Sequence, residues 1–217
     1  ARARGSELRI GLVEDVAQRD GAACGVRVDG ETLEADAVVL AMGPWTGRLA
    51  RRLPRPRIRG VKGYSVTLVG AEVPAHALFV DYRTAGGRTL EPEIFPRPDG
   101  DVYVCGMADP APLPDSPDDV DVSDAACETL ARAAGCVSTA LAAARIDRRQ
   151  ACYRPVTDDG LPLIGRVPGI AGAYVATGHG PWGMLNAPAT GLALAELITD
   201  GAASSVDLRA FDPSRPV

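Results

Sequence analysis

The amino-acid sequence predicts a mixed α/β (α+β) fold, in which an antiparallel sheet is inserted into a domain with buried central strands. Three stretches support this prediction. Residues 35–43 form a mostly apolar run that ends in glycine, residues 58–106 contain several short β-branched runs, and residues 171–200 have the pattern of a strand, a glycine-rich turn and a helix. The expected segments are 1–56, 57–148 and 149–217.

Composition and charge exclude several classes of protein. The 217-residue chain is 46% hydrophobic, enough to fill a core, and its formal net charge of −5 argues against a nucleic-acid or anionic-membrane partner. No apolar run reaches the length of a membrane span, so a soluble protein is expected. The five cysteines form no Cys-x-x-Cys pair, so we expect no disulfide framework and no metal site, and reduced thiols favour the cytoplasm.

The first segment contains a strong hairpin signal. Residues 8–16 alternate loosely between apolar and polar, and Asp29-Gly30 predicts a hairpin within residues 25–34. Residues 35–43 are then expected as a central strand covered on both faces. Because that strand ends in glycine, the backbone of a cofactor can pass close to it. A short helix is expected at residues 45–53.

The middle segment predicts shorter strands. Residues 60–69 and 77–82 are expected to be strands, and Pro98-Asp99-Gly100 predicts a turn that joins residues 93–97 to residues 101–106. This pattern is typical of an antiparallel sheet.

A proline-rich acidic stretch follows the sheet. Residues 109–124 are expected to form an exposed loop in which Asp121 or Ser123 caps the next helix. The alanine-rich residues 125–144 predict that helix, broken at Gly135.

Arg154 is the first candidate for chemistry. The proline that follows it keeps Arg154 out of the helical region, so its backbone is extended. A fixed arginine presents a planar fork of donors that suits a carboxylate. The alternative is a structural arginine that pairs with Asp158 or Asp159.

The chain is organised around residues 171–200. Residues 174–177 predict a short strand, three glycines follow within six residues, and residues 185–198 carry apolar side chains at helical spacing. Pro188 is expected in the first turn of this helix, where its missing N–H costs nothing. Such a turn aims free backbone N–H groups and the positive helix end at one point, where an electron-rich or anionic group fits.

The glycine spacing Gly178-x-Gly180-x-x-Gly183 also matches a dinucleotide fingerprint. That fingerprint needs a second strand after the helix and an acidic residue about 20 positions later. The 17 residues that follow Asp200 contain no buried parallel strand, so a nicotinamide-binding module is disfavoured. The remaining alternative is a glycine turn that only lets a strand pack on a helix.

Three motifs resemble one family in order and spacing. They begin at Ala41 (Ala-Met-Gly-Pro-Trp-Thr), at Tyr153 (Tyr-Arg-Pro-Val-Thr-Asp-Asp-Gly-Leu-Pro-Leu-Ile-Gly) and at Thr177 (Thr-Gly-His-Gly-Pro-Trp-Gly-Met-Leu-Asn-Ala-Pro-Ala-Thr-Gly). Together they resemble the FAD-dependent amine oxidoreductases of the D-amino-acid oxidase, glycine oxidase and sarcosine oxidase family. The resemblance covers residues 8–213 and implies a partial FAD-binding Rossmann-like domain (1–56 and 149–217) with an inserted substrate-binding sheet domain (57–148).

The family's ADP-binding fingerprint is absent from this sequence, because in the family it lies upstream of the matching part. The chain also begins without Met. We therefore expect a C-terminal part whose missing N-terminal part, on the same polypeptide, is its partner.

The resemblance also implies the site residues. Arg154 matches an arginine that holds the substrate carboxylate, and Val13 matches a residue whose backbone contacts adenine. His179 is expected to act mainly through its backbone. The other residues that the resemblance places against the flavin are Ala41, Met42, Gly43, Gly178, Gly180, Pro181, Trp182, Gly183, Met184 and Leu185.

The sequence departs from the family in two ways. The position at which some sarcosine oxidases attach flavin through cysteine is Ala151, so non-covalent FAD is expected. Pro181 and Trp182 occupy the places where glycine oxidases have an additional arginine and sarcosine oxidases a lysine. A second carboxylate anchor is therefore missing, and Trp182 either forms a wall for a bulkier amine or packs.

The resemblance implies an oxidoreductase that takes a hydride from the carbon next to an amine nitrogen. The resulting imine is hydrolysed by water, and oxygen or an electron carrier reoxidises the FAD. The substrate is expected to be a small amine or amino acid. The alternative is a non-catalytic scaffold or assembly factor that keeps the fold.

Overall fold

The computed structural model describes residues 2–49 and 58–215, so part of the helix predicted at 45–53 lies outside the described residues. The chain forms two compact units, residues 1–59 with 155–217 and residues 60–154. The predicted mixture of helices and antiparallel sheets is confirmed. The second unit ends inside strand β11 (Arg145–Thr157), later than the predicted boundary at residue 148.

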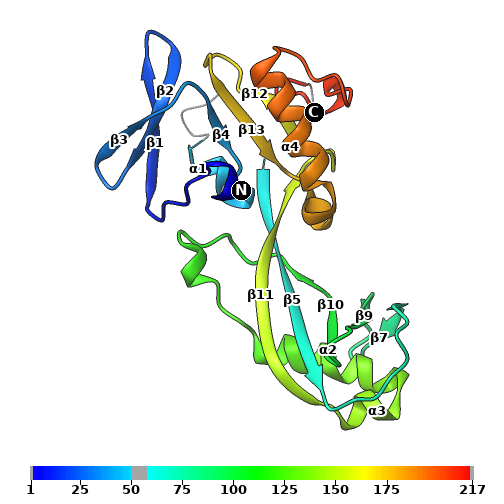
Figure 1. Ribbon diagram of the computed structural model, residues 1–217. Helices are drawn as coiled ribbons and strands as arrows, with labels where there is room; N and C mark the ends of the chain where they lie inside the picture. Colours follow the sequence, from blue (N-terminus) through cyan, green and yellow to red (C-terminus); the bar gives the residue numbers. More distant parts are fainter. Residues whose placement is uncertain (1, 50–57, 216–217) are drawn as a thin grey trace. The chain divides into compact units, whose positions relative to one another are not determined.

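In the first unit, the sequence near the N-terminus forms a three-stranded antiparallel sheet (Figure 1). The predicted hairpin at Asp29-Gly30 is confirmed, and both residues have the positive φ that a tight hairpin turn requires. A second hairpin turns at Asp20-Gly21 in the same way and was not predicted. The strands are β1 (Val13–Arg19), β2 (Ala22–Val28) and β3 (Glu31–Glu34).

A second three-stranded sheet carries the core of this unit. Its order is β12 (Leu163–Arg166), β13 (Ala173–Thr177) and β4 (Val38–Leu40), and β13 runs parallel to β4. The prediction that residues 35–43 form a strand covered on both faces is wrong for the described residues. Within β4, Val38 and Leu40 are buried but Val39 is 41% exposed, and β4 lies at the edge of the sheet.

Helix α4 (Gly183–Thr199) follows β13 through the 3-10 helix η4 (Gly180–Trp182). The prediction that Pro188 lies in the first turn is wrong, because η4 leads directly into a helix that begins at Gly183. At the other end of α4, the Arg166 guanidinium donates to the carbonyl oxygens of Leu197 and Gly201 at 3.4 and 3.0 Å. The bond to Leu197 satisfies one of the last carbonyls that a helix end leaves free, and the bond to Gly201 fixes the residue that follows the C-cap.

Among the described residues, the first unit also contains shorter elements. They are η1 (Arg2–Arg4), η2 (Gly43–Trp45), α1 (Thr46–Leu49) and η5 (Arg209–Phe211). None of the helices in the described parts of the chain is long and apolar enough to cross a membrane.

The second unit is built on a five-stranded sheet in the order β11, β5, β10, β9, β6. The predicted hairpin between β9 and β10 is confirmed. The single strand predicted at residues 77–82 is wrong, because β6 pairs with β9 while β7 pairs with β8 in a separate ribbon. The bounds are β5 (Ile58–Val69), β6 (Leu78–Phe79), β7 (Tyr82–Arg83), β8 (Thr89–Leu90), β9 (Glu93–Pro96) and β10 (Val102–Asp109).

One face of this sheet packs against α2 (Asp124–Val137). The hydroxyl of Ser123 accepts a hydrogen bond from the N–H of Ala126 and so caps α2. Ser123 was one of the two residues predicted to cap this helix. The other predicted cap, Asp121, forms an ion pair with Lys62 instead. The loop before α2 contains only the short 3-10 helix η3 (Pro117–Asp119).

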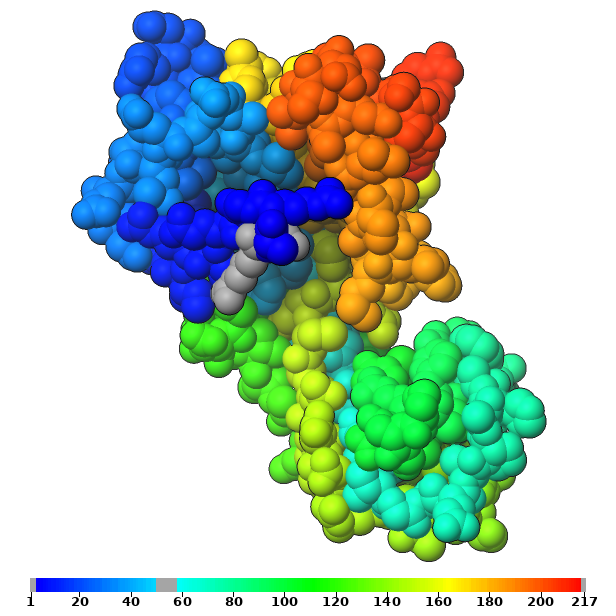
Figure 2. All heavy atoms as spheres, in the orientation of Figure 1, coloured from blue at the N-terminus to red at the C-terminus, as the bar shows by residue number. Residues whose placement is uncertain are grey.

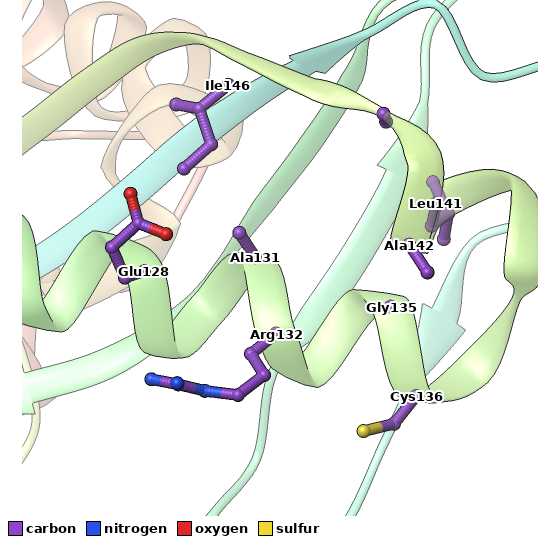
Figure 3. Close-up of a pocket in the computed structure, with 9 residues that line it drawn as sticks. Glu128, Ala131, Arg132, Gly135, Cys136, Leu141, Ala142 and Ile146 are labelled. Atoms are coloured by element: carbon purple, nitrogen blue, oxygen red, sulfur yellow. The ribbon is translucent and has the colours of Figure 1, made fainter.

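The predicted break at Gly135 is wrong. The chain breaks at Ser138, whose extended backbone separates α2 from α3 (Thr139–Ala143) and whose hydroxyl caps α3. A Cβ at Gly135 would lie 3.1 Å from the Cα of Ala142, so glycine permits the close approach of the two helices seen in Figure 3. A cavity of about 460 Å³ between α2, α3 and the start of β11 contains none of the predicted site residues.

Candidate functional site

The parallel pair of β4 and β13 brings two predicted cofactor segments to one edge of a sheet. The carboxyl ends of parallel strands lie at the same edge, and Ala41–Gly43 follows β4 while Gly178 follows β13. The hydroxyl of Thr177, which is buried, donates to the carbonyl oxygen of Gly43 at 2.9 Å. This bond, which sequence reasoning missed, joins the two glycine turns directly.

Both turns depend on glycine backbones. Gly43, Gly178 and Gly180 have φ values of +56°, +81° and +57°, in the left-handed region. At Gly178 space is limiting as well, because a Cβ there would lie 2.8 Å from the Cγ2 atom of Thr157. The turn therefore keeps its shape only with glycine at position 178.

Hydrogen bonds hold Thr157, the residue that limits the space at Gly178, in place. Its hydroxyl donates to the carbonyl oxygen of Leu161 at 2.7 Å. Arg215 donates to both carboxylate oxygens of Asp159, at 2.7 and 2.9 Å, and to the carbonyl oxygens of Leu161 and Pro162. Asp159 is thus paired with Arg215, and the alternative pairing of Asp159 with Arg154 is wrong.

Asp159→Asn is expected to remove a pH-dependent part of the stability. Hydrogen bonds from Arg215 lower the pKa of Asp159 from its ordinary value of 3.8. The stabilisation is therefore complete above about pH 4 and is lost as the pH falls further, through the pKa of the folded state. Because the carboxylate is partly solvated, we expect a loss of about 1 kcal/mol at neutral pH. Urea unfolding between pH 6 and 2 measures this difference.

Asp36→Asn is the matched control for that measurement, since Asp36 is exposed in the same unit. An equal pH dependence in the Asp159→Asn and wild-type proteins would contradict the assigned pair.

The start of α4 has no side-chain cap. Neither η4 nor α4 is capped by a side chain, in contrast to the serine caps of α2 and α3. The positive end of this helical segment is thus left without a capping side chain. The side chains around them are apolar and exposed: Trp182 is 61%, Met184 93% and Leu185 73% exposed. Figure 2 shows this part of α4, in orange, at the molecular surface.

These features fit the flavin of FAD. A flavin is a flat ring system with hydrogen-bond acceptors along one edge, so it needs both an apolar surface and a set of N–H donors. The turn from Gly178 to Leu185 supplies the exposed apolar side chains and a helix start without a side-chain cap, and it lies beside Gly43.

His179 contributes a side-chain contact that sequence reasoning did not predict. Its Nε2 atom lies 3.0 Å from the hydroxyl oxygen of Thr190 on α4. Burial lowers the pKa of His179, so the imidazole is neutral at neutral pH. The side chain therefore ties the turn to the helix.

The two remaining predicted residues lie in other parts of the fold. Val13 begins β1, in the sheet that contains neither β4 nor β13. Arg154 belongs to the second unit, where its guanidinium lies on Gly63; a Cβ added there would be 3.6 Å from the Arg154 Cζ atom. No carboxylate of the described residues pairs with Arg154. The adenine contact of Val13 and the substrate contact of Arg154 stay predictions.

The chain is similar to several known proteins. It is 36% identical to the Saccharomyces cerevisiae protein TDA3 over 190 residues, which cover 84% of this chain and 35% of that protein. It is 29% identical to glycine oxidase of Bacillus subtilis over 196 residues, or 89% of this chain and 49% of that enzyme. The crystal structure of glycine oxidase from Geobacillus kaustophilus matches with a TM-score of 0.79 and 28% identity, over 95% of this chain and 52% of that one.

The chain thus spans about half, or less, of the length of these relatives. A family model described as FAD-dependent oxidoreductase matches residues 1–197. This match confirms the family predicted from the three motifs. The chain therefore belongs to the family of FAD-dependent oxidoreductases.

Proposed function

We propose that this chain is the C-terminal part of an enzyme that oxidises the C–N bond of an amine or amino acid. When bound, FAD accepts a hydride from the carbon next to the nitrogen and is reoxidised by oxygen or an electron carrier; water then hydrolyses the imine. The observation that carries this proposal is the uncapped start of α4, with its exposed apolar side chains, beside two glycine turns.

In this proposal, the backbone of Gly178–Leu185 would hold the flavin of FAD. The positive end of α4 would favour negative charge on the group bound there. Binding is non-covalent, because the position of the attaching cysteine in some relatives is Ala151. Trp182, 61% exposed beside the turn, is available as a wall for the substrate.

Arg154 would hold the substrate carboxylate. Its extended backbone precedes Pro155, and its guanidinium lies on Gly63 without an ion-pair partner among the described residues. An unpaired guanidinium with one planar face against a glycine keeps its edge donors for a ligand.

We further propose that another part of the same polypeptide, such as the relatives have, completes the flavin pocket. Met184, Leu185 and Leu192 on α4 are more than half exposed, although α4 is apolar on all sides, as in a helix that another element covers. Val13 would contact the adenine within that complete pocket. The five free thiols support a reducing, cytoplasmic location.

The test uses the natural full-length polypeptide. We expect flavin absorbance in the purified protein, and bleaching of that absorbance when a substrate is added without oxygen. Arg154→Ala is expected to raise KM about 30- to 150-fold with a smaller change in kcat, since it removes a charged hydrogen bond of about 2–3 kcal/mol. Steady-state kinetics measures both constants.

Arg132→Ala, an exposed arginine on α2, is the matched control and should leave both constants unchanged. Bound flavin that no amine or amino acid reduces, together with an Arg154→Ala variant indistinguishable from wild type, would favour the non-catalytic scaffold.

A further inference from the structure

One row of side chains crosses the five-stranded sheet on the face that α2 does not cover. The register pairs Glu93 with Phe79 on β6 and with Cys105 on β10, and pairs Cys105 with Ser65 on β5. Residues directly opposite in antiparallel strands point to the same face. The neighbouring residues Val66, Val104 and Ile94 point to the other face and pack on α2. The row Phe79–Glu93–Cys105–Ser65 therefore lies on the face that α2 does not cover, where Ser65 and Cys105 are themselves buried and Phe79 is exposed.

Arg154 lies on this same face. Its guanidinium is next to the Cβ position of Gly63, and Gly63 is two residues from Ser65 on β5. Residues two apart on a strand point to the same side. An arginine and a glutamate thus share one sheet face, separated by Ser65 and Cys105.

The charge of Glu93 is not balanced within the unit. Its Oε2 atom lies 3.7 Å from the Cys105 thiol, and none of the described basic side chains forms an ion pair with it. Burial and the charge of Glu93 raise the pKa of Cys105 to about 11, whereas the charge of Arg154 acts in the opposite direction. The thiol is therefore neutral at physiological pH and lies under the influence of both charges.

Glu93 also borders open space. With Phe79 it lines a cavity of about 300 Å³ whose other described lining residues are Val80, Asp81 and Glu91. The Phe79 ring meets the Phe95 ring edge-on, with the ring centroids 5.9 Å apart. A cavity lined by carboxylates and an aromatic ring, without a basic side chain in its lining, suits a cationic group.

We propose that Glu93 determines substrate specificity by binding a distal cationic group of the amino acid whose carboxylate Arg154 holds. This inference rests on the proposed function. Strands lie about 4.8 Å apart and residues along a strand about 3.3 Å apart, so roughly 12 Å separates the backbones of Gly63 and Glu93. The Glu93 carboxylate extends toward Cys105 on β10, so the two charges lie closer together than the two backbones. A dibasic amino acid such as ornithine, lysine or arginine carries a carboxylate for Arg154 and a distal cation for Glu93.

Glu93 would also reject other substrates. A neutral side chain leaves the carboxylate without a counter-charge, and a second substrate carboxylate meets a like charge. The missing second carboxylate anchor in the turn, where Pro181 and Trp182 stand, agrees with a substrate that is recognised through a cation instead.

The test compares lysine with norleucine, which lacks the ammonium group, on the FAD-loaded full-length polypeptide, with both enantiomers of each. We expect kcat/KM to favour lysine at least tenfold and Glu93→Gln to remove about tenfold of that preference. Glu72→Gln, an exposed glutamate in a loop of the same unit, is the control and should retain the preference.

Binding provides a second readout. The α-methyl derivatives of lysine and norleucine have no α-hydrogen to transfer, so calorimetry can measure their dissociation constants without turnover. Glu93→Gln should weaken α-methyllysine about tenfold and leave α-methylnorleucine unchanged.

The two proposals can fail separately. Oxidation of norleucine as efficient as that of lysine, with equal effects of Glu93→Gln on both, overturns the role of Glu93 and leaves the amine oxidation intact. If no amine or amino acid reduces the flavin while the Glu93-dependent binding preference persists, the proposed reaction is the part that fails.

Discussion

Gly178→Ala is expected to destabilise the protein by about 3 kcal/mol and to lower its affinity for FAD at least tenfold. A φ of +81° costs an alanine about 1 kcal/mol. The added Cβ would also lie 2.8 Å from the Cγ2 atom of Thr157, and overpacking of this kind costs a further 1–3 kcal/mol. Thr157 cannot rotate away without breaking its hydrogen bond to Leu161. Urea unfolding and titration with FAD measure the two effects.

A double variant separates the two causes. Thr157→Ser keeps the hydroxyl and removes Cγ2, so in the Gly178→Ala background it should recover most of the overpacking cost and none of the backbone cost. Gly86→Ala is the control for the substitution itself, because Gly86 has no atom within 4 Å of its Cβ position and no positive φ. A Gly178→Ala protein as stable as Gly86→Ala would show that the turn tolerates a side chain.

The glycine turn could be predicted because its causes are local. Glycines, a strand and a helix follow each other within residues 171–200, and each has its own signal in the sequence. The bonds that hold the turn join distant residues: Thr177 with Gly43, 134 positions apart, and Arg215 with Asp159, 56 positions apart. Neither threonine nor arginine at these positions carries a pattern that identifies its partner, so these contacts required the structure.

For the strand at residues 35–43, the sequence pattern predicted more burial than the structure has. A continuous apolar run predicts burial on both faces, but the run itself does not say which strands are present beside it. In the described chain β13 lies on one side of β4 and Val39 is exposed. The apolar run therefore predicted the position of the strand correctly, but it did not predict which faces of the strand are covered.

Lys62 was missed for a related reason, since a lysine in a strand is normally solvated. Here it is 1% exposed and forms an ion pair with Asp121, whose side chain is 82% exposed. Its ammonium also lies 5.3 and 6.0 Å from the ring centroids of Tyr64 and Tyr153. The Tyr153 hydroxyl donates to the carbonyl oxygen of Pro112 at 2.6 Å, so the acidic loop is fastened to the sheet at two points.

The two members of this pair are expected to respond differently to substitution. Asp121→Asn leaves the buried ammonium of Lys62 without its counter-charge and should lower Tm by about 5 °C or more, whereas Lys62→Met leaves only a solvated carboxylate and should lower Tm less. The double variant should therefore be more stable than Asp121→Asn alone. Asp119→Asn, exposed in the same loop, is the control for the loss of an acidic charge, and calorimetry measures all four proteins.

The pH dependence gives an independent check of the same pair. Hydrogen bonding to Lys62 lowers the pKa of Asp121 from 3.8, so its contribution is complete above about pH 4 and is lost as the pH falls below that value. Burial alone would lower the pKa of Lys62, but the hydrogen bonds of Asp121 and Tyr64 raise it above 10.5, so its contribution is lost only as the pH rises through that higher value. The Tm difference between wild type and Asp121→Asn should thus be constant from about pH 5 to 9 and shrink below pH 4. A difference that is already absent at neutral pH would mean that water, and not Asp121, compensates the ammonium of Lys62.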